Sequence, residues 1–172
     1  MDLFSLIETN SFSSIWFWIL IAISWSSGSH FIIGVPFDLV QRARREGGHY
    51  EERVHILLEI NIDRLRSIQS IAGQLIVLLA SFLLTGLLLL GFVYDVEFFQ
   101  AAFLLCFPWV FVGALTLRAV RKLDGGLPQG EELYKFFSRL RLSIQFVGLI
   151  SIFVTSVWGM YYAILISSFP NI

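Results

Sequence analysis

The stretch Ile71–Val93, "IAGQLIVLLASFLLTGLLLLGFV", runs for 23 consecutive residues without a charged side chain. A helix of about 20 predominantly apolar residues crosses a hydrocarbon core about 30 Å thick. Three other stretches are also long and apolar enough to cross a bilayer: Ile15–Val35, Phe98–Leu117 and Ser143–Ile166. We therefore predict four transmembrane helices.

Composition supports the membrane class. Hydrophobic residues make up 56% of the 172 residues and charged residues only 15%, which is more apolar surface than one soluble core can hide. No stretch alternates apolar and polar residues over about ten positions as a barrel strand does. The predicted fold class is an all-α polytopic membrane protein, a single domain whose cytoplasmic segments, 36–70 and 118–142, form helical extensions.

The cations predict the orientation. All 12 Lys and Arg residues lie between the first and second or between the third and fourth apolar stretches. Connections rich in Lys and Arg stay in the cytoplasm. We expect both connections to face the cytoplasm and both termini to face the opposite, periplasmic side.

Both connections show helical patterns. After Gly47 and Gly48, apolar residues recur at helical spacing without a breaker, which predicts one helix over Tyr50–Val93, about 65 Å long. After the glycines of "LDGGLPQGEEL", Glu131 and Glu132 suit the first turn of a second helix because acidic side chains favour the positive end of the helix dipole. We expect the two extensions to pack together in the cytoplasm.

Small residues predict where membrane helices approach closely. Ala22, Ser26, His30 and Gly34 recur every four residues in the first stretch. The fourth stretch has a matching face, formed by Gly148, Ser151, Thr155 and Gly159. Because small side chains let helix backbones approach within a bilayer, we predict that the first and fourth stretches form a close pair.

His30 has two readings. Near the inner end of the first stretch it could form an interhelical hydrogen bond, with Gln145 or Gln74 as partner. Ionisable groups within membranes are costly and often functional, so a proton relay or a cofactor ligand is the alternative. The structural reading is the hypothesis kept here.

Two polar clusters have simple interpretations. The run of cations after the first apolar stretch acts as a topogenic signal, which keeps this connection in the cytoplasm. It consists of Arg42, Arg44 and Arg45, which are also suited to contact anionic lipid headgroups or a cytoplasmic partner. His55, Glu59 and Asp63 share a helix face but lack the facing Glu and Glu-x-x-His motifs of di-metal bundles. We expect that face to be solvated.

No motif for catalysis appears in the chain. It has no phosphate-binding glycine loop after a strand, no nucleophile elbow and no zinc-protease helix. Its one cysteine, Cys106, lies within the third apolar stretch and is expected to be a core residue. We expect no enzymatic activity, cofactor, metal or nucleic-acid partner.

Three motifs resemble those of a known family: "SGSHFIIGVPFDLVQRARREGG", "EINIDRL" and "SIFVTSVWGMYYAIL". The chain is similar, over nearly its whole length, to small four-helix membrane proteins of alphaproteobacteria that are commonly labelled as a component of a SufBCD complex. The resemblance implies a bacterial inner-membrane location and carries no catalytic residue. One thiol within a bilayer cannot scaffold an iron-sulfur cluster on cytoplasmic proteins, so nothing is implied for Cys106.

Three functions remain open. The first is a non-catalytic accessory or assembly subunit that docks onto a larger, bioenergetic inner-membrane complex. The second is a membrane anchor for a cytoplasmic complex such as the iron-sulfur assembly machinery. The third is a small transporter or channel, which the scarcity of buried polar residues and the absence of an inverted repeat disfavour.

Overall fold

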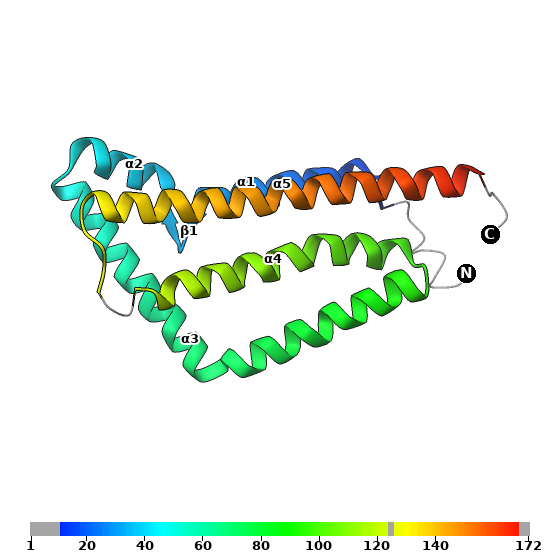
Figure 1. The fold of residues 1–172 in the computed structure, drawn as a ribbon, viewed down its shortest axis with the longest axis horizontal. Coiled ribbons are helices and arrows are strands. Elements are labelled where there is room, and N and C mark those ends of the chain that lie inside the picture. Colours follow the sequence, from blue (N-terminus) through cyan, green and yellow to red (C-terminus); the bar gives the residue numbers. More distant parts are fainter. Residues whose placement is uncertain (1–10, 124–125, 169–172) are drawn as a thin grey trace.

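The computed structural model describes residues 11–123 and 126–168, which are almost entirely helical (Figure 1). The elements are α1 (Ile15–His30), β1 (Phe31–Ile32), β2 (Val35–Pro36), α2 (Phe37–Glu46), α3 (His49–Leu88), the π-helical turn η2 (Leu89–Val93), α4 (Glu97–Arg121) and α5 (Glu131–Ser168). The predicted all-α class is confirmed. The helix predicted over Tyr50–Val93 is also confirmed, since α3 and η2 run on without a break.

Among the described residues, three helices are long and apolar enough to cross a membrane: His49–Val93, Glu97–Arg121 and Glu131–Leu165. The first two contain the second and third predicted stretches, and the last contains the fourth except for its final residue, Ile166. The first stretch differs, because its helix α1 has 16 residues and spans about 24 Å at 1.5 Å per residue.

The prediction that the first stretch is helical as far as Val35 is wrong. Helix α1 ends at His30, and β1 and β2 then pair as a hairpin in the register Phe31 with Pro36 and Ile32 with Val35. Ile33 and Gly34 form its two-residue turn with φ of 51° and 71°, the positive values that a tight hairpin requires. Pro36 keeps Val35 out of the α conformation, because the residue before a proline is disfavoured there, and Val35 accordingly lies in β2.

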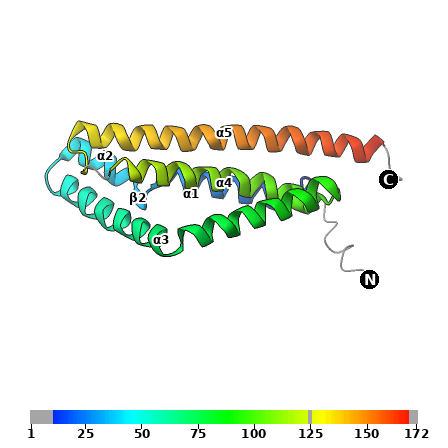
Figure 2. The ribbon, with the colours of Figure 1, turned by 60° about the horizontal axis from the view of Figure 1, so that its bottom comes forward.

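The helices run lengthwise in one bundle, and the connections gather at its two ends (Figures 1 and 2). Helix α2, the first turns of α3 and α5 and the last turn of α4 lie at one end. The first turn of α1, the turn between η2 and α4 and the last turns of α5 lie at the other. Both connections that contain the cations therefore lie at the same end of the molecule.

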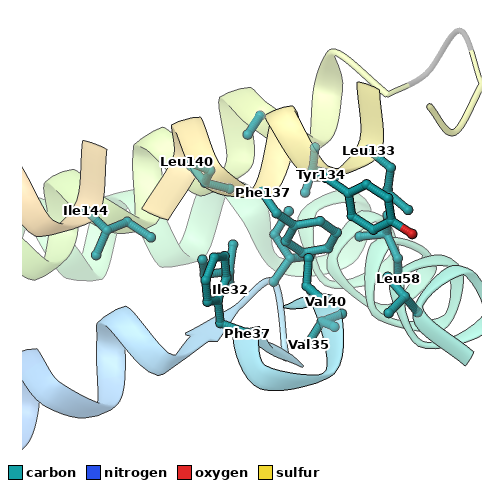
Figure 3. Close-up of a cluster of buried hydrophobic side chains, with 14 of the residues drawn as sticks. Ile32, Val35, Phe37, Val40, Leu58, Leu133, Tyr134, Phe137, Leu140 and Ile144 are labelled. Atoms are coloured by element: carbon teal, nitrogen blue, oxygen red, sulfur yellow. The ribbon is translucent and has the colours of Figure 1, made fainter. Parts of the chain in front are cut away.

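The charged end has its own hydrophobic core, called here the inner layer (Figure 3). Leu133 and Phe137 of α5 and Leu58 of α3 are fully buried, together with Ile32 and Val35 of the hairpin. Helix α2 contributes Val40 and packs against both α3 and α5. The predicted packing of the two extensions is confirmed, with α2 joining them.

The apolar halves of the long helices are much less buried. In the most apolar 18-residue window of each spanning helix, the buried share is 6% for α3 with η2, 22% for α4 and 28% for α5. Figure 1 shows that α3 bends and that α4 lies between its second, green half and the pair α1 and α5. Most of the apolar half of α3 therefore has no protein cover in this chain.

Candidate functional site

Helix α1 has two contrasting faces. Ile21 and Trp25 are buried against the bundle, whereas Ala22, Ser26 and His30 are exposed. The predicted ridge on the first stretch therefore points away from the fourth stretch. The predicted close pairing of the first and fourth stretches is confirmed, because α1 packs on α5. The predicted face is wrong, because the larger Trp25 and not the ridge occupies that contact.

Gly34 does not belong to the ridge. It lies in the hairpin turn with positive φ, and a Cβ added there would meet the side chain of Asn61 at 2.7 Å. Asn61 in turn donates a hydrogen bond of 2.8 Å to the carbonyl oxygen of Leu57. Gly34 therefore allows the turn to lie directly on α3, and the predicted contact with segment four is wrong.

The small residues of α5 lie on its inward face. Ser151 and Thr155 are 8% and 1% exposed. A Cβ added to Gly148 would meet the Trp25 ring at 2.7 Å, and one added to Gly159 would meet Phe12 at 3.2 Å. Aromatic rings from the N-terminal region thus fill the space that these small residues leave, in place of a second small-residue ridge.

His30 contacts neither glutamine proposed as its partner. Its Nε2 atom lies 3.9 Å from Oδ2 of Asp38, and both side chains are largely exposed. Its ring also packs edge-on against Phe31. His30 therefore lies at the surface where α1 gives way to the hairpin, and its expected bond to Gln145 or Gln74 is wrong.

A tryptophan pair joins α1 to α4. The rings of Trp25 and Trp109 stack with centroids 5.3 Å apart and planes 16° apart. A Cβ added to Gly28 would lie 2.5 Å from the Trp109 ring. Gly28 therefore provides the flat surface against which Trp109 lies.

A buried polar network at the opposite end was not predicted. Gln100 is 1% exposed; its Nε2 donates to the Gly91 carbonyl at 2.9 Å, and its Oε1 accepts from Trp158 Nε1 at 3.0 Å. The bonds link α4 to η2 and α5. Because every polar group is satisfied, the network is structural, and the glutamine within an apolar stretch was its only sequence signal.

A groove of about 1170 Å³ opens between α3 and α4. Its walls are mostly apolar, and they include the hairpin turn and Trp109. Two arginines, Arg64 and Arg121, are the only charged residues that line it among the described part of the chain. With its amide oxygen turned toward Arg121, Gln69 accepts hydrogen bonds from that guanidinium. From the sequence, both arginines were interpreted only as charges that set the membrane topology.

The three arginines predicted to contact headgroups or a partner lie on α2 and are exposed. Arg44 makes two contacts of 3.4 Å with the Glu131 carboxylate of α5, and Arg45 donates to Gln41 at 3.4 Å. An exposed ion pair contributes only about 0 to 1 kcal/mol. These residues are therefore largely available to solvent or to a ligand.

A metal site finds no support in the described residues, where no group of three or more His, Cys, Asp or Glu side chains could hold an ion. His55, Glu59 and Asp63 instead line a small surface pocket with Arg66. Cys106 is half-buried in α4 as a free thiol.

No protein-family model, curated protein or solved structure matches this chain. The class that the fold defines is a helical bundle in which, over the part of the chain that the structure describes, three helices are long and apolar enough to span a membrane. The exposed surfaces of this bundle are the features that bear on a narrower function.

Proposed function

We propose that this protein is a non-catalytic accessory or assembly subunit of a bacterial inner membrane, and that it docks onto a larger bioenergetic membrane complex through α1. The observation that carries the proposal is the exposed ridge of Ala22, Ser26 and His30. Small and polar residues on a membrane helix favour contact with another helix, because lipid offers no hydrophobic drive for association. Among the described residues, the contacts of α1 with the bundle come from its opposite half, at Ile21 and Trp25, so the ridge is left for a partner.

The proposal requires α1 to lie in the membrane as a fourth span. Helix α1 packs along α5 within its apolar half, where Trp25 covers Gly148. If α5 spans the membrane, α1, packed beside the apolar half of α5, lies at the same depth in the bilayer. The hairpin then adds length beyond the 24 Å of α1, and the cations of α2 follow at the cytoplasmic surface.

Site-specific photocrosslinking tests the docking face. A photoreactive amino acid at Ser26 should crosslink, in native membranes, to one integral membrane protein identified by mass spectrometry, and that protein should copurify in a fixed ratio. The matched control is Leu149, which is 68% exposed on α5 and should crosslink only to lipid. Equal crosslinking from both positions, or none from Ser26, would contradict the proposal.

The membrane-anchor function is the second candidate, favoured by the exposed cations of α2. In that case the partner would be a cytoplasmic complex such as the iron-sulfur assembly machinery. A photoreactive residue at Arg42 would then capture a cytoplasmic protein, and Ser26 would capture none. The same experiment therefore separates the two functions.

A further inference from the structure

The groove between α3 and α4 combines an apolar body with a cationic end. Arg64 and Arg121 line it without any acidic residue among the described lining, and no described carboxylate pairs with either guanidinium. Its volume, about 1170 Å³, is on the scale of small-molecule sites. We propose that this groove binds an anionic glycerophospholipid, with the phosphate at the two arginines and an acyl chain along the apolar walls.

The depth of each group supports this orientation. Arg121 is the last residue of α4 and Arg64 lies in the charged first part of α3, whereas Ser81 lies in the uncharged second part of α3 and Trp109 in the middle of α4. From Arg64 to Ser81 the helix advances roughly 25 Å at 1.5 Å per residue. A headgroup at the interface and a chain directed into the bilayer match that order. Basic pockets between membrane helices on the cytoplasmic side bind anionic headgroups in this way.

The polar side chains at the cationic end suit a phosphate. Gln69 already bonds to the Arg121 guanidinium, which leaves further N–H donors of Arg121 for an anion. Arginine recognises phosphate through paired N–H donors with defined geometry. The occupant is therefore anionic, and a zwitterionic lipid with the same chains is expected to bind more weakly.

Native mass spectrometry of the detergent-solubilised protein tests the proposal. With added dioleoylphosphatidylglycerol the protein should retain one lipid more strongly than with dioleoylphosphatidylcholine. Each arginine contact near a lipid surface is worth enough to change affinity about fivefold. The double variant Arg64→Gln/Arg121→Gln should therefore bind phosphatidylglycerol about thirtyfold more weakly.

The charge-matched control is Lys135→Gln/Arg139→Gln, which removes two exposed cations from α5 outside the groove and should leave binding within about twofold. Equal losses in the two double variants would mean general surface attraction and would overturn the proposal. The proposal would also be overturned if the wild-type protein bound phosphatidylglycerol no more strongly than phosphatidylcholine. Competition by millimolar inorganic phosphate alone, without lipid selectivity, would indicate a free-phosphate site and would also overturn it.

A second variant keeps both arginines and fills the groove. A Cβ at Gly113 meets nothing within 4 Å, so Gly113→Leu places a bulky side chain in the groove wall without a clash. It should weaken lipid binding at least fivefold. Gly86→Leu is the control, since Gly86 is equally open but lies outside the described lining, and binding should not change. Lipid binding that withstands Gly113→Leu would exclude the acyl chain from this groove.

Discussion

The inner layer at the charged end and the apolar halves of the long helices are packed by different forces. In the inner layer, fully buried side chains such as Leu58 and Phe137 form a core resembling that of a soluble protein. In the apolar half, only 6% of the most apolar window of α3 is buried. The hydrophobic effect rewards burial where water is the alternative, whereas in lipid close contacts and hydrogen bonds determine which helices meet. Trp25 on Gly148 and Gln100 on Gly91 are contacts of that second kind.

The largest expected effect is in the inner layer. Phe137→Ala removes a fully buried ring and should lower the free energy of unfolding by about 3 to 5 kcal/mol. Denaturant unfolding in detergent measures the loss, and hydrogen exchange should show it in α2 and the first turns of α3. Phe146, which is 61% exposed, is the control. An equal loss in Phe146→Ala would mean that the two halves are not packed differently.

A smaller effect is expected where α1 meets α5. Gly148→Leu forces a side chain into the Trp25 ring, since even a Cβ would lie 2.7 Å from it. Overpacking of this kind costs about 1 to 3 kcal/mol. Trp25→Ala in the same chain should recover part of the loss, because the two sites are in contact and their effects are coupled. Gly86→Leu is the control and should leave the free energy of unfolding unchanged, because a Cβ at Gly86 meets nothing within 4 Å. If the losses from Gly148→Leu and Trp25→Ala were simply additive, Trp25 would not contact Gly148, and the account would be contradicted.

The smallest effect is expected at His30. Its ionic contact with the described residues is a distance of 3.9 Å to Asp38 at the surface, so His30→Gln should change the free energy of unfolding by less than about 0.5 kcal/mol. The amount of assembled complex should also stay normal, because glutamine retains a donor and an acceptor on the docking ridge. A variant that assembles but loses the activity of its parent complex would instead make His30 a functional residue, since glutamine cannot exchange a proton near neutral pH.

Much of the fold could be predicted because helical periodicity and charge placement are local signals. The long helix through Val93, the start of α5 at Glu131 and the shared core of the extensions all follow from such patterns. The hairpin was missed because its turn residue Ile33 is β-branched and adopts positive φ, which only the surrounding packing can stabilise. The proline at position 36 was the local signal that could have indicated it.

The candidate sites could be predicted less well, because they depend on which face of a helix turns inward. The ridge of α1 was predicted to contact the fourth stretch, but sequence spacing cannot show that Trp25 takes the inner side. The groove depends on the separation between α3 and α4, and Arg64 and Arg121 are far apart in the chain. Only the folded structure brings them to one cavity.

The central claim is that α1 crosses the membrane and that the inner layer lies in the cytoplasm. Accessibility of single cysteines to an impermeant thiol reagent tests it most directly. In a Cys106→Ser background, Ser13→Cys and Asp95→Cys should be labelled in intact cells, and Gly47→Cys should be labelled only after permeabilisation. Labelling of Gly47→Cys from the same side as Ser13→Cys would show that α1 does not cross the bilayer and would contradict the account.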